Sequence, residues 1–408
     1  MKLFEKNSSP HRQAKLILED GSEFTGWSFG KARSQAGEMV FTTAMAGIQL
    51  SLSDPGFKGQ ILVAAYPLAT DSGIAYNNKT GEVYTDTQGI PLELESTAVH
   101  AAGFVVSELC TEPKKTEAPA INDSRITRRS TLSEWLEKSN VPGIYGIDTR
   151  ALVKRLREYG NMRGKILVEG TRDVTFDSGI YANPAEEISA MQNKNYLPQI
   201  HNADRKTAAA VTAQNRQYKI ALIDCGTKAN VIRCLLARNA EVLVLPWNHD
   251  LKNIEYDGLM LSGGPGDPKN CGKTIATVRR AFDLKKPVFG TGLGCNIMAL
   301  AAGGDSYKLP YGHRGTNQPC IETGTSRCYV TSQNHGYAIR SESLPKGWDC
   351  WFVNGNDNSV EGIKSKNHPF FAVQFAPEGC PGPRDTEFLF DRFLTEVSRF
   401  AAEKENKK

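Results

Sequence analysis

The stretch Phe289-Gly-Thr-Gly-Leu-Gly-Cys-Asn296 decides the fold of the second half of this chain. A strand that runs into a glycine-flanked turn and then a helix follows the pattern Gly-x-Nuc-x-Gly of a nucleophile elbow, which thrusts one side chain above the edge of a sheet. Gly290 and Gly294 stand at the flanking positions, and Gly292 stands at the position of the nucleophile. The sequence therefore predicts an elbow without its nucleophile.

Apolar strands alternate with amphipathic helices on both sides of this elbow. We expect strands over 219–225, 241–246, 258–262 and 287–290, and helices over 228–240, 274–284 and 384–402. This alternation predicts an α/β domain with an open parallel sheet of the flavodoxin-like type, covered by helices on both faces. A binding site is expected at the carboxyl ends of the strands, where the elbow lies.

The first half of the chain has a β-rich α/β pattern. An Asp-Gly turn at Asp20 predicts a hairpin over 15–24, and short apolar stretches predict strands at 39–41, 60–65 and 103–106. Helices are expected over 131–138 and 148–159, the second with Asp148 as its N-cap. We expect an N-terminal domain over 13–169, a linker over 170–215 and a C-terminal domain over 216–402.

Composition excludes several classes of function. The 408 residues carry 49 basic and 45 acidic side chains without a dominant block, so no nucleic-acid groove is expected. No apolar run approaches the ~20 residues that span a bilayer, and the polar first dozen residues do not form a secretory signal. The nine cysteines are odd in number and lack zinc-ligand spacing, which predicts reduced thiols, no metal and no cofactor. We expect an intracellular protein, cytoplasmic or organellar, including mitochondrial, and not a secreted or membrane one.

Three further segments complete a pattern with the elbow: Gly263-Gly-Pro-Gly-Asp-Pro268, Ser332-Gln-Asn-His-Gly-Tyr337 and Gln374-Phe-Ala-Pro-Glu378. With them the chain resembles the class I (triad) glutamine amidotransferases and, more narrowly, the small subunit or amino-terminal half of carbamoyl-phosphate synthetase. The narrower resemblance covers about residues 13 to 400 and includes Phe41-Thr-Thr-Ala-Met-Ala-Gly47. Phrases such as Leu245-Pro-Trp-Asn-His-Asp250 are similar to the ammonia-dependent type.

The resemblance implies a catalytic triad that this chain has largely lost. In the family a cysteine at the elbow attacks glutamine, a histidine removes its proton, and a glutamate orients the histidine. The elbow position here is Gly292, the histidine position is Ala376, and the glutamate is kept as Glu378. Because removal of a triad nucleophile typically costs about 10⁶-fold in rate, we expect no useful hydrolysis of glutamine.

The glutamine pocket that the resemblance implies is altered less evenly. Two positions depart from the family pattern, Ala44 in place of a serine and Asn296 in place of a glutamine, so any glutamine affinity is expected to be weak. Positions that match the family are Gly264, Gly266, Leu293 with its oxyanion N–H, Asn334, Gly336 and Tyr337. These loops also fit a second interpretation, in which they persist because the fold needs their turns.

Two nearby side chains are candidates for replacing the lost groups. Cys295 lies three positions after Gly292, about one helical turn from the required place, and is expected to be a packed thiol. His335 falls in what we expect to be an Asn-His-Gly loop, where a turn-stabilising hydrogen bond is its predicted role.

Three hypotheses of function follow. The first is an inactive accessory or regulatory partner of an ammonia-using synthetase, in nitrogen metabolism that leads to pyrimidines or arginine. Because the chain ends at residue 408 without ATP-binding halves, that hypothesis requires a large synthetase chain as partner. The second is a structural or scaffold protein within a larger assembly. The third is an active glutaminase that delivers ammonia for carbamoyl phosphate synthesis through an improvised site.

Overall fold

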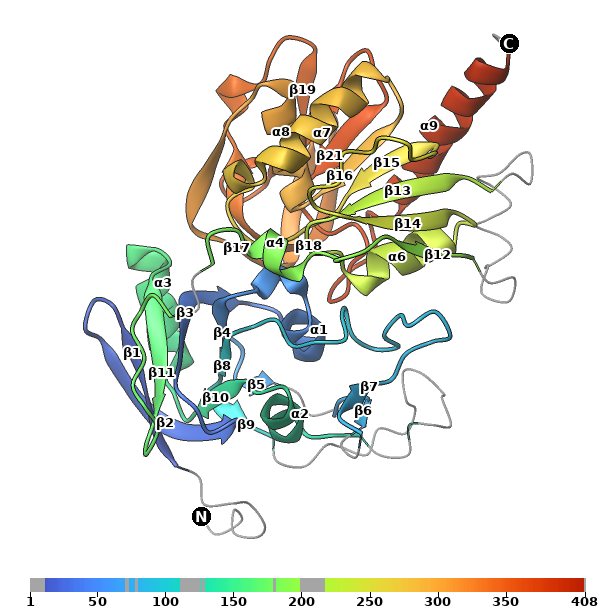
Figure 1. Ribbon diagram of the computed structural model, residues 1–408. Coiled ribbons are helices and arrows are strands. Elements are labelled where there is room, and N and C mark those ends of the chain that lie inside the picture. Colours follow the sequence, from blue (N-terminus) through green and yellow to red (C-terminus); the bar gives the residue numbers. More distant parts are fainter. Residues whose placement is uncertain are drawn as a thin grey trace. The chain divides into compact units, whose positions relative to one another are not determined.

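The computed structural model describes residues 12–69, 73–77, 80–110, 126, 129–178, 181–198 and 217–406, and Figure 1 shows its ribbon. The chain divides into two compact units. The first comprises Met1–Ser53, Gly59–Thr85 and Thr97–Ile180, and the second comprises Asp54–Lys58, Asp86–Ser96 and Tyr181–Lys408. Two short segments of the first half of the sequence therefore belong to the second unit.

The first unit is built on a closed barrel, which confirms the β-rich pattern of this half. In barrel order its strands are β1 (Gln13–Leu18), β11 (Arg163–Val168), β3 (Gln35–Thr42), β4 (Gln60–Ala64), β8 (Gly103–Val105), β10 (Pro142–Tyr145) and β2 (Glu23–Gly30). The predicted hairpin is the antiparallel pair β1 and β2, with Gly21 at φ +87° in its turn. Closure of the strands into a barrel was not predicted, because pairing between distant strands leaves no local signal.

Two helices accompany the barrel, α2 (Leu132–Lys138) and α3 (Thr149–Tyr159). The predicted N-cap of α3 is present, since Asp148 Oδ1 accepts a hydrogen bond of 2.9 Å from the N–H of Ala151. Helix α2 begins with a capping box in which Thr131 and Glu134 satisfy each other's backbone donors. The smaller elements of this unit are α1 (Ile48–Leu52), β5 (Leu68–Ala69), β6 (Tyr76–Asn77), β7 (Glu82–Val83) and β9 (Glu108–Leu109).

The second unit contains a ten-stranded sheet with a parallel centre. The parallel strands, in sheet order, are β14 (Glu241–Pro246), β13 (Lys219–Asp224), β15 (Gly258–Leu261), β16 (Val288–Thr291) and β21 (Phe370–Val373). Strand β12 (Lys194–Tyr196) pairs antiparallel at one edge. The other edge continues through β20 (Val360–Ser365), β18 (Cys328–Ile339), β17 (Ser306–Glu322) and β19 (Trp348–Asn354), all antiparallel. The predicted α/β fold is confirmed, and its sheet is mixed rather than parallel throughout.

Helices cover both faces of this sheet, as predicted. Side chains alternate along each strand, so Ile220 and Leu222 of β13 enter one apolar cluster while Ala221 and Ile223 enter the other. The first cluster includes α6 (Ala229–Leu236) and α9 (Phe388–Glu405), and the second includes α7 (Gly272–Asp283) and α8 (Leu293–Ala302). Single-turn helices lie at η1 (Pro55–Phe57), η2 (Pro268–Asn270) and η3 (Ser341–Ser343).

The expected linker 170–215 contains more structure than its polar sequence suggests. Residues Pro184–Ile188 form α4, and Lys194–Tyr196 form the edge strand β12. Only one of the three residues of this edge strand, Tyr196, is buried. The run Lys-Asn-Tyr therefore has no alternation of apolar and polar residues that would predict a strand. Residues 199–216 lie outside the described part of the chain, and the domain boundaries at 169 and 216 stay predictions.

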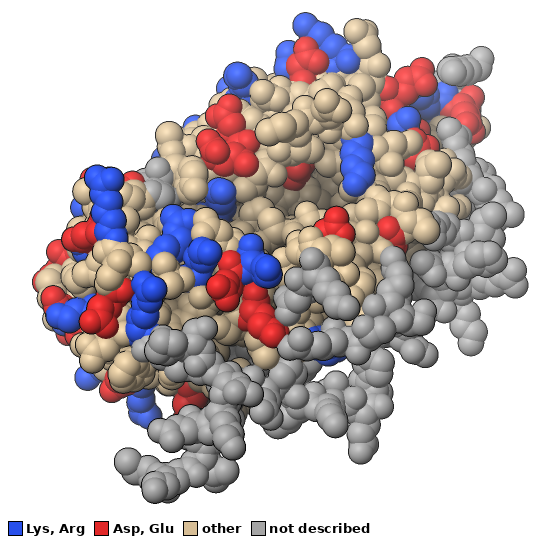
Figure 2. All heavy atoms as spheres, turned by 60° about the horizontal axis from the view of Figure 1, so that its bottom comes forward, with Lys and Arg blue, Asp and Glu red and all other residues tan. Residues whose placement is uncertain are grey.

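The surface carries charges of both signs. Figure 2 shows lysine and arginine side chains next to aspartate and glutamate side chains on the face that it presents. On the barrel unit Arg163 pairs with Glu19 at 2.7 Å, and Lys165 pairs with Asp173 at 2.7 Å.

Among the described residues no helix combines the length and apolarity needed to cross a bilayer.

The aromatic centre of the second unit gives a test of its packing. Phe289 is fully buried in β16, and its ring lies 4.8 Å from that of Phe371 and 5.7 Å from that of Phe393, centroid to centroid. Phe289→Ala should destabilise this unit by about 3–5 kcal/mol, because the lost packing leaves a cavity. Calorimetry should show a lower unfolding temperature, whereas Leu284→Ala, at an exposed position, should leave it unchanged. Equal effects of the two substitutions would contradict this description of the core.

Candidate functional site

The predicted elbow forms at the carboxyl end of β16. Gly292 lies between β16 and α8 with φ 52° and ψ −117°. A residue with a side chain would be held in this conformation at a cost of ~1–3 kcal/mol, whereas glycine adopts it with little strain. The N–H of Gly292 donates to Val373 O at 2.9 Å, which ties the elbow to the neighbouring strand β21.

The glycines that flank the elbow are required by packing. A Cβ atom on Gly290 would lie 2.8 Å from Gly294 O, and one on Gly294 would lie 2.7 Å from Leu261 Cβ. At Gly292 the nearest atoms to a Cβ would be Gly263 Cα at 3.2 Å and Gln374 O at 3.9 Å. A side chain at Gly292 would therefore need its neighbours to shift by only a few tenths of an ångström, so the elbow has room for one.

The expected position of the catalytic base, Ala376, lies on the segment that follows β21. The N–H of Ala376 donates to Ser332 O at 2.8 Å, and the N–H of Gly379 donates to Ala376 O at 3.1 Å, so the backbone is fixed on both sides. The side chain of Ala376 is a partly exposed methyl group, which cannot accept a proton. At this expected position the backbone is well defined and the side chain cannot act as a base.

Glu378, the expected third triad position, forms an ion pair with a lysine. Its Oε1 lies 3.0 Å from Nζ of Lys228, which also donates to Gly379 O at 2.7 Å. The Glu378 side chain is 3% exposed, and its Oε2 has no hydrogen-bond partner among the described residues. Glu378 is thus the counter-ion of a buried cation in this chain.

A second carboxylate completes this buried charge cluster. Glu95 Oε2 accepts from the N–H of Asn230 at 3.1 Å, and Glu95 Oε1 lies 3.4 Å from Nη1 of Arg233. Burial raises the pKa of Glu95 against the opposing effect of Lys228 and Arg233. For Lys228, burial favours the neutral amine, but the carboxylates of Glu378 and Glu95 outweigh it and raise the pKa.

The expected glutamine-pocket positions come from three elements of the second unit. Gly264 and Gly266 follow β15, Leu293 and Asn296 lie in the first turn of α8, and Asn334, Gly336 and Tyr337 lie in β18. Two of these elements meet, because a Cβ on Gly264 would lie 3.2 Å from Leu293 Cδ2 and 1.9 Å from Cys225 O. The latter distance means that no other residue fits at Gly264 with this backbone.

Gln374 connects α8 to β18. Its Oε1 accepts from Asn296 Nδ2 at 3.0 Å, and its Nε2 donates to Tyr337 O at 2.7 Å. Leu293 is the first residue of α8, so its N–H lacks an acceptor within the helix, as expected for an oxyanion-hole donor. Asn334 is engaged elsewhere, since its Nδ2 donates to Asp54 Oδ2 at 3.0 Å.

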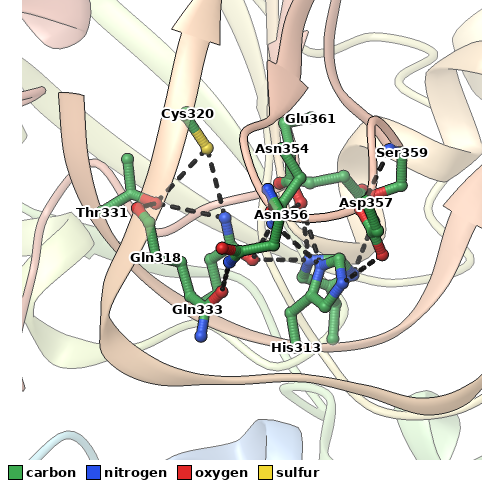
Figure 3. Close-up of polar contacts among 12 residues, drawn as sticks. His313, Gln318, Cys320, Thr331, Gln333, Asn354, Asn356, Asp357, Ser359 and Glu361 are labelled. Atoms are coloured by element: carbon green, nitrogen blue, oxygen red, sulfur yellow. Dashed lines mark hydrogen bonds and ion pairs between the residues drawn. The ribbon is translucent and has the colours of Figure 1, made fainter. Parts of the chain in front are cut away.

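His335 does not lie in a loop, as the sequence analysis expected, but within strand β18. Its Nδ1 lies 2.9 Å from Tyr337 O, so the expected local hydrogen bond exists, and its Nε2 lies 3.4 Å from Glu361 Oε1. The glycine in Asn-His-Gly suggested a turn, but here long cross-strand pairing with β17 overrides it. Figure 3 shows the polar cluster that His313 and Glu361 form with their neighbours.

Cys295 cannot replace the missing nucleophile. It is fully buried in α8, and burial raises the pKa of its thiol well above the ordinary value. A thiolate is the reactive form of cysteine, so this side chain is the packed thiol that the sequence predicts.

Several residues of the site escaped sequence analysis. Lys228 follows strand β13 at the carboxyl edge of the sheet, a place where a charged side chain could have been flagged. Glu95 and Asp54 come from segments more than a hundred residues away in sequence, and no local pattern marks them.

The buried pair predicts a structural role for Glu378 that does not depend on catalysis. Glu378→Ala leaves the Lys228 ammonium buried without its nearest carboxylate and should destabilise the second unit by about 3–5 kcal/mol. The expected result is a lower unfolding temperature, measured by calorimetry. Glu342→Ala is the control, since Glu342 is exposed and lies 3.8 Å from Arg340. An unfolding temperature unchanged by Glu378→Ala would contradict the role of counter-ion.

Two family models match this chain in succession. Residues 16–166 match the carbamoyl-phosphate synthase small chain, CPSase domain, and residues 221–395 match the class-I glutamine amidotransferase model. The second range lies within the unit with the mixed sheet, and the first covers the barrel together with the two short segments, Asp54–Lys58 and Asp86–Ser96, that belong to the second unit.

Curated relatives extend this similarity over almost the whole chain. Multifunctional protein pyr1-3 of Dictyostelium discoideum is 41% identical over 94% of this chain and 17% of its own length. The mitochondrial carbamoyl-phosphate synthase [ammonia] of Mus musculus is 39% identical over 95% of this chain and 24% of its own length. The chain thus spans about a sixth to a quarter of these long relatives. The carbamoyl phosphate synthase small chain of Pyrococcus furiosus is 39% identical, and the match covers 94% of this chain and 97% of that one. On this evidence the chain belongs to the family of carbamoyl phosphate synthase small chains.

Proposed function

We propose that this chain is a glutaminase-like component that does not hydrolyse glutamine and that acts as an accessory or regulatory partner of an ammonia-using synthetase chain. The observation that carries the proposal is the pair Gly292 and Ala376, a hydrogen and a methyl group where glutamine hydrolysis needs a thiolate and an imidazole. Both stand on well-formed backbone, the first at an elbow and the second on a bridged segment. The chemistry is absent from a site whose shape is kept.

The size of the expected loss supports this proposal. Removal of a triad nucleophile costs about 10⁶-fold in rate, and further loss of the base adds little. The remaining donor at Leu293 could stabilise an oxyanion, but no attacking group within the site would generate one. Glu378 is a poor replacement for the missing base, because its carboxylate is already paired with Lys228. With alanine at position 376, it also has no histidine to orient.

The proposed partner is a large chain that carries the ATP-dependent chemistry, either as a separate polypeptide or as part of a longer one. The Pyrococcus furiosus relative is named a small chain, and the Mus musculus relative is named for ammonia. By this analogy the compartment is intracellular, cytoplasmic or organellar, and the product feeds pyrimidine or arginine synthesis. The kept barrel and elbow supply a surface for such a partner without supplying ammonia.

Glutamine binding is proposed to be weak. Nδ2 of Asn296 donates to Gln374, and Nδ2 of Asn334 donates to Asp54. A ligand that used either amide nitrogen would have to replace an existing hydrogen bond, which lowers its net gain in free energy. The backbone N–H of Leu293 remains the most available of the expected contacts.

The first test measures glutamine hydrolysis by the pure chain and by three variants. With the unmodified chain, ammonia should be released from glutamine no faster than in buffer without protein. The single variants Gly292→Cys and Ala376→His should give the same result. The double variant Gly292→Cys/Ala376→His should gain measurable activity with a high KM, because the elbow has room for a side chain and the pocket is altered. Calorimetry confirms that each variant is folded.

Turnover by the unmodified chain that disappears in Glu378→Gln would overturn the proposal and support an active glutaminase instead. A silent double variant would leave the inactivity of the parent chain intact. It would show that the altered pocket, as well as the triad, limits the chemistry.

The partner is tested separately by affinity purification from native extract, followed by mass spectrometry. An ATP-dependent synthetase in about equal amount is the expected result, because the chain matches a carbamoyl phosphate synthase small chain over almost its whole length. Recovery with structural proteins alone would contradict the accessory role and support the scaffold hypothesis.

A further inference from the structure

A buried polar cluster, which Gln374 connects to the first turn of α8, has the character of a metal site. His313 of β17 and His335 of β18 stand directly opposite each other in the pairing of these strands, and Glu361 comes from β20. Each of the three is less than 10% exposed, and one ligand atom from each lies within 4.8 Å of the others. Figure 3 shows His313 directed at Glu361, with Asn354 and Gln333 beside them.

An acceptor outside the cluster faces one nitrogen of each ring. Nε2 of His313 lies 2.9 Å from Asp357 Oδ2, and the other carboxylate oxygen of Asp357, Oδ1, accepts from the N–H and Oγ of Ser359 at 3.0 and 2.8 Å. Nδ1 of His335 lies 2.9 Å from Tyr337 O. When each ring carries its hydrogen on this outer nitrogen, the inner nitrogen is an acceptor; Gln374 Nε2, at 3.3 Å, is a further neighbour of Nδ1 of His335. Carboxylates and carbonyls in this position are the usual outer partners of metal-binding histidines.

The inner atoms are therefore acceptors that face one another. Nδ1 of His313 lies 3.1 Å from Glu361 Oε1, and Nε2 of His335 lies 3.4 Å from the same oxygen. Gln333 Oε1 lies 3.2 Å from Nε2 of His335. Ligands of a tetrahedral zinc ion, each about 2.0–2.2 Å from the metal, stand about 3.3 Å apart. These three distances, 3.1 to 3.4 Å, are close to that value, and the ligand atoms of His313, His335 and Glu361 all lie within 4.8 Å of one another.

Positive charge at the centre of this cluster would satisfy all of its acceptors. Glu361 is fully buried, and its Oε2 has no hydrogen-bond partner among the described residues. Asn354 Nδ2 donates to Glu361 Oε1 at 3.1 Å and lies 3.3 Å from Nδ1 of His313, so it supplies part of the requirement. The remaining hydrogen-bond donors or positive charge for these acceptors must come either from protons on the inner nitrogens or from one cation.

We propose that His313, His335 and Glu361 bind a divalent transition metal, with zinc as the best fit, and that Gln333 Oε1 is the fourth neighbour. The ligands are two imidazoles and a carboxylate, a set that zinc accepts, and the enclosure on three strands indicates a structural site. The metal would join β17, β18 and β20 in the antiparallel half of the sheet. The cysteine spacing predicted no metal, and this site uses no cysteine.

The test uses the chain without an affinity tag, stripped with a chelator and then titrated with zinc. About one zinc per chain should be retained after gel filtration, measured by plasma mass spectrometry. The unfolding temperature should rise by on the order of 5–10 °C when free zinc exceeds Kd a hundredfold. Cobalt should produce visible absorption bands of a low-symmetry site, a readout that needs no variant.

Variants separate this site from surface binding. Glu361→Gln and His313→Gln should each lower the retained zinc at least tenfold, whereas His368→Gln, at an exposed histidine, should retain it in full. If either cluster variant does not fold, the cobalt spectrum of the unmodified chain decides. No retained zinc and no rise in unfolding temperature would overturn the proposal. The inner nitrogens of His313 and His335 would then carry protons in place of a metal. Retention that depends on His368 and not on the cluster would overturn it as well.

Discussion

The close approach of three strand ends at the carboxyl edge of the sheet is the constraint on which the site depends. Gly264, Gly290 and Gly294 stand where a Cβ atom would lie 1.9 to 2.8 Å from neighbouring atoms, so the backbone itself requires glycine. These contacts serve packing and do not involve catalysis. The elbow can therefore hold its shape without a nucleophile, and glycine at position 292 adopts the required backbone conformation with little strain.

Electrostatics gives Glu378 a role that does not depend on catalysis. Its carboxylate balances the buried ammonium of Lys228. Replacing one partner of a buried ion pair leaves the other uncompensated, which is strongly destabilising. Under the proposal of an inactive site, this structural function is a reason for the chain to keep Glu378 while Gly292 and Ala376 stand at the other two expected triad positions.

Sequence patterns gave most of the parallel half of the second unit and the elbow itself, because strands such as Glu241–Pro246 and the run of alternating glycines carry strong local signals. They did not reveal the closed barrel, the edge strand Lys194–Tyr196 or the strand placement of His335, since these depend on pairing between distant segments. Glu95 acts on the charge of Lys228, and Asp54 accepts a hydrogen bond from Asn334. Both acidic residues come from the first hundred residues, so these contacts could be found only in the three-dimensional structure.

The most direct test of the account is the origin of the nitrogen in carbamoyl phosphate made by the assembled synthetase that contains this chain. The reaction is run with glutamine labelled with ¹⁵N in its amide group and with unlabelled ammonium, each alone and then together. The account predicts product from ammonium only, with no label in the carbamoyl group. Label transferred from the glutamine amide, lost when Glu378 is replaced by glutamine, would contradict it.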